Sequence, residues 1–389
     1  MDSKSTNNKK ISCSKASQCG GCAFINEKYE ASLAKKQELA NSLFSKLCNS
    51  VKPIVGAENP YFYRNKVHAA FAGSGKNIIC GTYAEGTHKV IDTSNCLIEN
   101  KKATEIINYI KELAVSFKVR IYDENRRQGL LRRVLIRTAD NTGEILVVLV
   151  ITDPVFPGKK DFIKKLVTKY PEIKSVVFNI NKRSDSMILG DKNIPAYGYG
   201  NITDVLCGLK FRISPESFYQ INHAQCERLY TLAIEGAKIK NTDKVLDAYC
   251  GIGTIGLIAS KSAGEVVGVE LNSKAVADAK TNAKLNNVTN ARFIGGDATE
   301  FIMQAAKAKE HFDVIILDPP RAGTTPEFVN ACEKLSPDRI VYVSCNPETL
   351  ARDLKLFKKA GYKADSVTPV DMFPFTNVNH VESVAILTK

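Results

Sequence analysis

The stretch LDAYCGIGTIG (residues 246–256) decides the fold of this chain. An apolar strand pattern stops at this stretch, and a helical pattern starts after its three glycines. A GxGxxG turn between a strand and a helix is typical of nucleotide-binding α/β sheets, because glycine lets the backbone approach a ligand closely. The stretch therefore predicts the first strand–turn–helix unit of such a sheet.

Strand and helix patterns alternate outward from this turn to the C-terminus. Alternation of this kind predicts a largely parallel sheet with helices on both faces, and therefore a Rossmann-like α/β fold. The expected strands are 244–249, 265–270, 291–295, 312–317, 339–344 and 380–388. The expected helices are 254–262, 273–286, 299–307, 326–335 and 347–360.

The part of the chain before this sheet has a different pattern. Short β-like runs follow one another between residues 67 and 180 with few helices, which predicts a smaller α+β domain with an antiparallel sheet. We expect a disordered tail at 1–12, this α+β domain at 13–210 and the Rossmann-like domain at 211–389. An amphipathic helix at 27–47 is expected to pack on a neighbouring element, with the catalytic domain as a candidate.

The positive charge of the chain is concentrated in its first part. Residues 1–220 hold 34 Lys and Arg against 21 Asp and Glu, whereas residues 221–389 hold 20 of each. This asymmetry favours a nucleic-acid partner for the first part. Arg126, Arg127, Arg132 and Arg133 crowd one loop and strand entry, where phosphate contact and a solvated charge cluster both remain open.

The chain shows no sign of a membrane segment or of a secretory leader. No apolar run approaches the roughly 20 residues that a membrane helix needs. The polar start, MDSKSTNNKK, lacks the apolar region of a signal peptide. We therefore expect a cytoplasmic protein, in which the 11 cysteines serve metal binding, catalysis or packing rather than disulfides.

Three of these cysteines lie close together near the N-terminus. Cys13, Cys19 and Cys22 flank a Gly-Gly turn, and Cys96, in a polar turn, is the natural fourth ligand. Four thiolates suit structural zinc or an iron–sulfur cluster, and the spacing alone does not distinguish the two.

Acidic residues follow the strands of the predicted sheet. A dehydrogenase is the first hypothesis that a GxGxxG turn raises, but Asp247 directly before the glycines suits a cationic ligand better than a pyrophosphate. S-adenosylmethionine carries positive charge and no phosphate. Asp247 would then hold its amino-acid end, Glu270 the ribose and Asp297 the adenine amine, with helix capping as the alternative role for Asp297.

Cys345 lies where the fifth strand opens into a helix, in Ser344-Cys-Asn-Pro347. Ligands bind at this edge of an open α/β sheet. A cysteine there is either a nucleophile or a packed core residue, and buried free cysteines are common. The preceding sheet, the acidic turn at Asp247 and the strand-end position beside the predicted methyl donor favour the nucleophile.

These motifs together resemble the RNA uracil-C5 methyltransferase family. The resemblance spans nearly the whole chain and rests on seven motifs in order. They are Cys13…Cys19-Gly-Gly-Cys22, Tyr63-Arg-Asn-Lys66, Ser214-Pro-Glu-Ser-Phe-Tyr-Gln-Ile-Asn222, Asp247-Ala-Tyr-Cys-Gly-Ile-Gly253, Asp318-Pro-Pro-Arg-Ala-Gly323, Ser344-Cys-Asn-Pro347 and His380-Val-Glu382. Related enzymes carry Asp-Pro-Ala-Arg where this chain has Asp318-Pro-Pro-Arg321, a mild departure.

The resemblance implies roles for individual residues. It implies a [4Fe-4S] cluster on the four cysteines named above. It implies an S-adenosylmethionine pocket lined by six residues: Gln220, Tyr249, Thr254, Glu270, Asp297 and Asp318. Cys345 would attack C6 of uracil, and Glu382 would remove the C5 proton after methyl transfer.

The resemblance also bears on the substrate. Many family members carry an N-terminal RNA-binding TRAM domain, for which the residues before Cys13 leave no room. This favours 23S rRNA, with a loop or single-stranded uridine as the target of a monomeric enzyme. The alternatives are uridine 54 of tRNA, a cytosine-C5 methyltransferase and a non-catalytic RNA-binding redox sensor.

Overall fold

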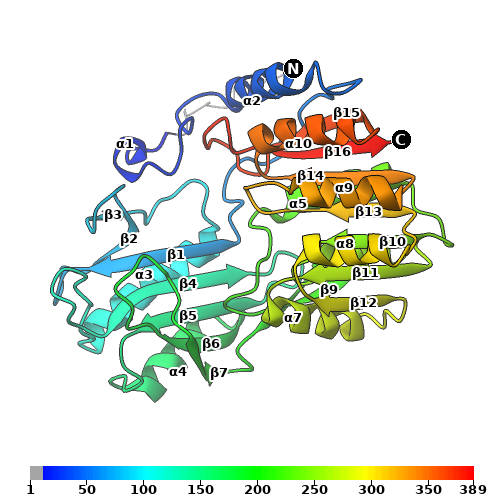
Figure 1. Ribbon diagram of the computed structural model, residues 1–389. Coiled ribbons are helices and arrows are strands. Elements are labelled where there is room, and N and C mark those ends of the chain that lie inside the picture. Colours follow the sequence, from blue (N-terminus) through cyan, green and yellow to red (C-terminus); the bar gives the residue numbers. More distant parts are fainter. Residues whose placement is uncertain (1–11) are drawn as a thin grey trace, which may run out of the picture.

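The computed structural model describes residues 12–389; the predicted tail therefore lies, except for Ser12, outside the described residues. Two seven-stranded sheets and a two-stranded hairpin make up its β-structure. The sheets lie side by side, one built from the first half of the chain and the other from the second half (Figure 1).

The C-terminal sheet has the strand order β12-β11-β10-β13-β14-β16-β15. The first five strands of this order run parallel, so their carboxyl ends meet at one edge. β16 runs antiparallel to β14 and therefore begins at that same edge. The strands are β10 (Lys244–Ala248), β11 (Glu265–Glu270), β12 (Ala291–Gly295), β13 (Val314–Leu317), β14 (Arg339–Ser344), β15 (Lys363–Val370) and β16 (Glu382–Thr388). This doubly wound sheet confirms the predicted Rossmann-like fold.

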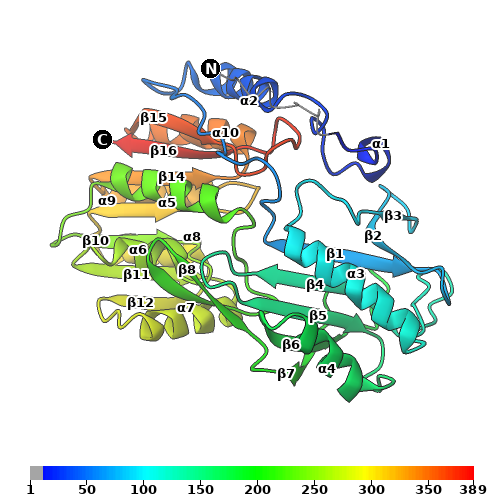
Figure 2. The ribbon, with the colours of Figure 1, turned by 180° about the vertical axis from the view of Figure 1, so that it is seen from behind.

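Helices cover both faces of this sheet because its strands are apolar on both sides. One face carries α8 (Ala298–Lys307), α9 (Pro326–Leu335) and α10 (Pro347–Lys359), and α2 (Tyr29–Phe44) packs beside α10 (Figure 1). The other face carries α5 (His223–Ala237), α6 (Thr254–Ala259) and α7 (Ser273–Leu285) (Figure 2). The helix predicted at 27–47 is thus shorter and lies against the C-terminal sheet.

The N-terminal sheet has the order β3-β2-β1-β4-β5-β6-β7. Five of its strand pairs are antiparallel, but β5 and β6 run parallel, so the expected antiparallel sheet is in fact mixed. The reason is α4 (Lys159–Lys169), which carries the chain across the sheet between them. The strands are β1 (Lys66–Ala72), β2 (Ile79–Tyr83), β3 (Val90–Asp92), β4 (Leu131–Thr138), β5 (Ile145–Ile151), β6 (Ile173–Ile180) and β7 (Lys192–Tyr197). Together with α3 (Lys101–Ser116), α4 covers its outer face (Figure 2).

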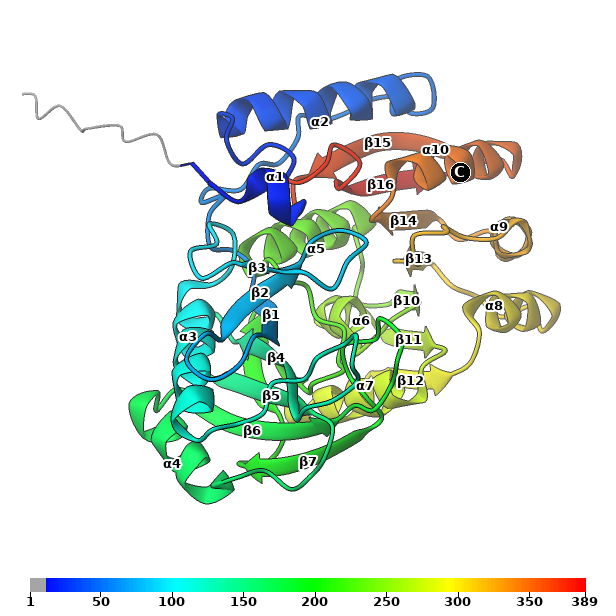
Figure 3. The same ribbon diagram turned by 90° about the vertical axis from the view of Figure 1, so that its left-hand side faces the viewer.

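Two segments connect the halves. The hairpin of β8 (Ile202–Leu206) and β9 (Leu209–Ile213) spans the expected boundary at 210 and buries its apolar side chains in a core shared by both sheets. The chain after α2 forms isolated parallel bridges with β15, from Cys48 to Val55. Figure 3 shows α2 above the remaining elements and the short α1 (Ala16–Cys19) below it.

In the second sheet, the prediction was least accurate for the last two strands of the chain, β15 and β16. The expected final strand at 380–388 begins at Glu382, and β15 was not predicted at all. Its sequence, KADSVTPV, mixes polar residues and a proline, which suits a sheet edge and obscures the strand pattern. No helix among the described residues has both the length and the apolar character needed to cross a membrane.

Candidate active site

A pocket of about 980 Å³ opens at the edge where the parallel strands of the second sheet end. The eight residues predicted for cofactor binding and catalysis all line it. They are Gln220, Tyr249, Thr254, Glu270, Asp297, Asp318, Cys345 and Glu382. The structure therefore brings together side chains that are up to 162 positions apart in the sequence, from Gln220 to Glu382.

The glycine turn after β10 forms one wall of the pocket. Tyr249 has a positive φ of 64°, and Gly253 has a φ of 82° at the N-cap of α6. The backbone N–H of Gly256 donates a 2.7 Å hydrogen bond to Oδ2 of Asp247. A Cβ atom at Gly256 would lie only 2.7 Å from that same oxygen, which explains the third glycine. Oδ1 of Asp247 is buried and has no hydrogen-bond partner among the described residues.

Glu270 and Asp297 follow β11 and β12 along the same edge. Glu270 accepts hydrogen bonds from the backbone N–H groups of Gly251 (3.1 Å) and Asn272 (2.7 Å). Asp297 caps α8, where its Oδ1 accepts from the N–H groups of residues 299 and 300. The alternative reading of Asp297 as a helix cap is therefore correct, although its side chain still lines the pocket.

Cys345 and Glu382 lie on neighbouring strands. The β14–β16 register pairs Ser344 with Ser383, and Cys345 and Glu382 are the next residues on the two strands toward the pocket. Asp318 follows β13, the other neighbour of β14. Asn346 caps α10 directly after Cys345 and donates from Nδ2 to the backbone oxygen of Arg321 at 3.1 Å, so the strand end is fixed.

Three carboxyl groups of the pocket hold their protons more tightly than free carboxyl groups. Burial raises the pKa of Asp247 and of Glu382 to about 8 each, and that of Asp318 to about 7. Burial and the nearby Glu382 and Asp318 carboxyls raise the pKa of the Cys345 thiol to about 11, while Arg321 opposes this shift. The pocket thus gathers groups whose ionisation a cationic ligand would favour.

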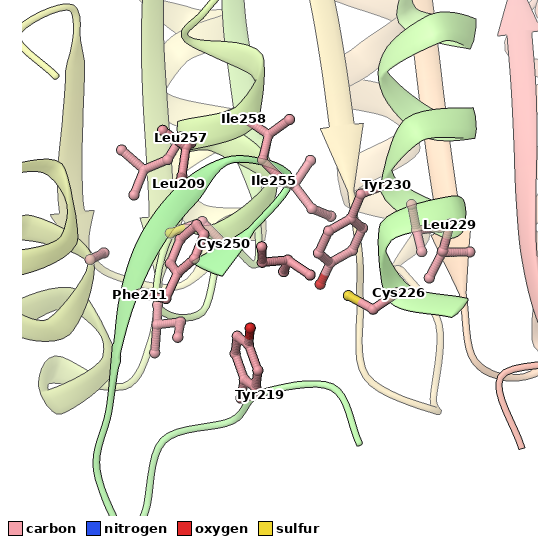
Figure 4. Packing of buried hydrophobic residues seen from close by; sticks show 14 of the residues in the cluster. Leu209, Phe211, Tyr219, Cys226, Leu229, Tyr230, Cys250, Ile255, Leu257 and Ile258 are labelled. Carbon is pink, nitrogen blue, oxygen red and sulfur yellow. The ribbon is translucent and has the colours of Figure 1, made fainter. Parts of the chain in front are cut away.

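Cys250, the other thiol of this region, has a different environment. It is 5% exposed and packs among apolar side chains under the glycine turn, as Figure 4 shows. Burial raises its pKa strongly, with Asp247 and Glu270 adding to the shift. Cys345, in contrast, is only partly buried at a strand end. This contrast favours Cys345 as the reactive thiol.

Several pocket residues were not predicted. Arg64 belongs to the Tyr63-Arg-Asn-Lys66 motif, for which no role was predicted, and His380 lies two residues before Glu382. Phe373 and Thr376 come from the chain between β15 and β16. The only sequence signal for Phe373, Thr376 and His380 is that they precede the last strand, which begins at the pocket. The antiparallel direction of that strand was not predicted.

The four cysteines predicted as ligands line a second cavity of about 360 Å³. They are Cys13, Cys19, Cys22 and Cys96. The pKa of Cys22 is raised to about 12, mainly by burial; Arg64 opposes the shift, and the other three thiols add to it. Arg64 lines both this cavity and the large pocket. Within residues 12–389, no set of three or more His, Cys, Asp or Glu side chains is arranged to hold a metal ion.

The arginines clustered between residues 126 and 133 differ in their exposure to solvent. Arg132 is 2% exposed, and it donates to both carboxylate oxygens of Glu124 and to two backbone oxygens. Arg133 is also mostly covered and stacks on Tyr83 at 5.1 Å. Phosphate contact is therefore wrong for Arg132, whereas Arg126, with its side chain 82% exposed, remains available.

Comparison with known proteins bears directly on the identity of this fold and pocket. Residues 201–389 match the family model described as tRNA (Uracil-5-)-methyltransferase. An uncharacterized RNA methyltransferase of Halalkalibacterium halodurans is 40% identical over 379 residues, covering 96% of this chain and 82% of the relative. Another, from Caldanaerobacter subterraneus, is 41% identical over 380 residues, with coverages of 97% and 84%.

Among solved structures, that of the Pyrococcus abyssi tRNA (uracil-54, C5)-methyltransferase in complex with S-adenosyl-L-homocysteine is similar over most of its length. It has a TM-score of 0.78 and 28% identity, and the match covers 93% of this chain and 84% of that one. The chain belongs to the S-adenosylmethionine-dependent RNA (uracil-5-)-methyltransferase family.

Proposed function

We propose that this enzyme methylates C5 of a specific uridine in RNA through a covalent adduct between Cys345 and C6 of the base. The observation that carries the proposal is the convergence of Cys345, Glu382 and the acidic residues on one pocket at the strand ends. A pocket of about 980 Å³ leaves room for a cofactor and a flipped-out nucleotide together.

The cofactor end of the pocket suits a cation. S-adenosylmethionine supplies an electrophilic methyl group when it is bound. The buried Oδ1 of Asp247, which has no hydrogen-bond partner within residues 12–389, would accept a hydrogen bond from the ammonium group of the cofactor. Glu270 would accept from the ribose hydroxyls and Asp297 would face the adenine amine through the oxygen not engaged in capping. Gln220, Tyr249, Thr254 and Asp318 complete this part of the wall.

Cys345 starts the chemistry. C5 of uracil is a weak nucleophile, and addition of the Cys345 thiolate to C6 gives an enolate across C4 and C5. The electron pair of that enolate would form the new C5–CH₃ bond while the bond between the methyl carbon and the sulfonium sulfur breaks, its electron pair staying on sulfur as a neutral thioether. Because the pKa of Cys345 is about 11 in the ligand-free protein, the thiol must give up its proton to solvent as the adduct forms.

Glu382 ends the chemistry. After methyl transfer, C5 carries both a proton and the methyl group. The ionised Glu382 carboxylate removes this proton, the electron pair restores the C5–C6 double bond, and the C6–S bond to Cys345 breaks. Its pKa of about 8 makes Glu382 a stronger base than an exposed carboxylate, and burial is the cause.

For the cysteine cavity we favour a [4Fe-4S] cluster over one zinc ion, as the resemblance to the uracil-C5 methyltransferase family implies. In such a cluster each of the four thiolates binds a different iron. The four thiols line one cavity of about 360 Å³. Cys13, Cys19, Cys22 and Cys96 would hold the cluster, as a structural or RNA-positioning element.

For the RNA substrate, 23S rRNA is the first candidate, in keeping with the basic N-terminal half. Uridine 54 of tRNA is the second candidate, and the similarity to a solved tRNA (uracil-54, C5)-methyltransferase supports this alternative. In vitro methylation of rRNA and tRNA that lack 5-methyluridine, followed by nucleoside analysis and mapping, separates the two. Methylcytidine as the product would overturn the proposal.

The nucleophile is tested with RNA that contains 5-fluorouridine. A fluorine at C5 cannot be removed as a proton, so the wild-type enzyme should remain covalently bound to this RNA. Cys345→Ala should form no complex. Cys207→Ala is the matched control, since Cys207 lies in the β8–β9 turn and should leave the complex unaffected. A covalent complex with Cys345→Ala would show that Cys345 is not the nucleophile.

A further inference from the structure

The chain between β15 and β16, residues 371–381, forms part of the pocket wall and will be called the pocket loop. Phe373, Thr376 and His380 of this loop line the pocket. The loop ends directly before Glu382, so its conformation sets where that carboxyl lies. What holds the loop in place therefore matters for the reaction.

Several groups donate hydrogen bonds to the start and tip of the loop, among them Asn222 and Tyr63. One lysine of the N-terminal helix α2 binds both its beginning and its end. The Nζ atom of Lys36 donates to Oδ1 of Asp371 at 2.6 Å, to the backbone oxygen of Phe373 at 2.9 Å and to that of His380 at 3.0 Å. An ammonium group has three N–H donors, and here all three bind the loop. The contacts join the beginning of the loop to its end.

Both charged groups are fully buried, with exposures of 0% for Lys36 and for Asp371. Oδ2 of Asp371 accepts a further hydrogen bond from the Tyr29 hydroxyl at 2.8 Å. A buried ion pair is a poor means of gaining stability, because removing two charges from water costs much of what their attraction provides. A geometric role accounts better for a lysine placed there.

The helix that carries Lys36 has little freedom to move. Ala40 and Phe44 of α2 are 0% exposed and lie in the core of the C-terminal sheet. The loop tip has its own anchor, since Phe375 adopts a positive φ of 64° and packs 5.4 Å from the ring of Tyr29. The lysine thus connects a rigid helix to both ends of a loop whose tip is fixed as well.

We infer that Lys36 is a positioning residue for the methyl-transfer reaction: by binding Asp371, Phe373 and His380 it fixes the pocket loop and, with it, Glu382. This inference rests on the proposed role of Glu382. Lys36 is not among the residues that line the pocket, so it would act only through the loop.

The test uses Lys36→Met in the full chain, together with the double variant K36M/D371N. Loss of Lys36 alone leaves Asp371 as an unpaired buried charge and can prevent folding. The D371N change removes that charge, while the amide oxygen still accepts from Tyr29. Lys35→Met is the matched control, because Lys35 is the preceding residue, 43% exposed, and binds Glu27.

With native RNA, we expect kcat of K36M/D371N to fall by between about tenfold and a hundredfold, as for other displaced catalytic groups. The Kd for S-adenosylmethionine should stay near the wild-type value, since its acidic contacts come from other strands. The methylated covalent adduct should accumulate, because a displaced Glu382 removes the C5 proton slowly. Lys35→Met should behave as the wild type.

A double variant that melts like the wild type and has wild-type kcat, with no adduct, would overturn the inference. Loss of kcat without any adduct would also overturn it, since that pattern indicates general disorder of the pocket. Glu382→Gln is assayed in parallel. Normal turnover by Glu382→Gln would overturn the proposed base, whereas a slow Glu382→Gln beside a normal K36M/D371N would reject only the role of Lys36.

Discussion

The two seven-stranded sheets of this enzyme are equal in strand number but place functional groups in different ways. In the C-terminal sheet, parallel neighbours bring the strand ends to one edge, so Asp247, Asp318 and Cys345 meet without long loops. In the N-terminal sheet, antiparallel neighbours send successive strand ends to opposite edges. Its cavity is formed instead by a folded N-terminal segment and the turn at Cys96.

The two cavities also share an electrostatic property. Each holds buried acidic groups, carboxyls in one and thiols in the other, whose pKa values are raised mainly by burial. A cationic partner would favour ionisation in both: the methyl donor in the pocket, and iron in the proposed cluster site. The two cavities are built mainly from different halves of the chain. We therefore expect that mutations can disrupt methyl transfer and RNA binding separately, the first in the C-terminal half and the second in the N-terminal half.

The largest effect should come from Glu382→Gln, which tests the catalytic half. Turnover should fall by about 10²- to 10⁴-fold, the usual contribution of a general base. RNA affinity should be unchanged, and the covalent adduct with native RNA should be visible on denaturing gels. Glu327→Gln, an exposed change on α9, is the control. Free turnover by Glu382→Gln would remove this residue from the mechanism.

The pH dependence of the reaction is the second way to test the catalytic half. Glu382 must be ionised to act as a base, and its pKa is raised to about 8. Proton removal by Glu382 follows methyl transfer and therefore limits kcat. Below that pH, kcat should rise about tenfold per pH unit, and the limb that belongs to Glu382 should end above it. Adduct formation with 5-fluorouridine RNA does not require Glu382 and should lack this limb. A turnover rate that does not change between pH 6 and pH 8 would contradict the assignment of Glu382 as the base.

An intermediate effect is expected from Cys22→Ser in the N-terminal half. Anaerobically purified wild-type protein should be brown and hold about four irons per chain, as a [4Fe-4S] cluster requires. The variant should lose the iron and the colour and unfold a few degrees lower. The methyl-transfer step, measured by adduct formation, should change far less than in Glu382→Gln. One zinc per chain in the wild type would reject the cluster.

The smallest effect should come from Arg126→Gln, an exposed side chain of the basic half. Loss of one phosphate contact should weaken RNA binding a few-fold and lower the salt-dependence slope by about one. Folding and the chemical step should not change. Arg132→Gln, in contrast, should destabilise the protein, because Arg132 is buried against Glu124. Equal RNA affinity for Arg126→Gln and the wild type would place the RNA elsewhere on the surface.

The sequence predicted the catalytic edge well because parallel strands obey a simple rule. Each strand pattern followed by a helix pattern places the residue between them at the same edge, which is how Glu270 could be assigned to the pocket. The assignment of Asp318 came instead from the resemblance to the methyltransferase family. The roles of Asp297 and Arg132 were harder to predict. Whether Asp297 caps a helix and whether Arg132 is buried against Glu124 depends on which groups lie within hydrogen-bond distance in the folded protein.

By itself, the sequence determined the Rossmann-like sheet, the glycine turn beside Asp247 and the thiol at the end of the fifth strand, because hydrophobic periodicity and turn chemistry are local properties. Only the tertiary structure decided what surrounds that thiol. The antiparallel β16 brings Glu382 to Cys345, and α2 crosses to the far end of the chain so that Lys36 binds the pocket loop. Lys36 and Asp371 are more than 300 positions apart in the sequence. No local sequence pattern encodes a contact of that kind.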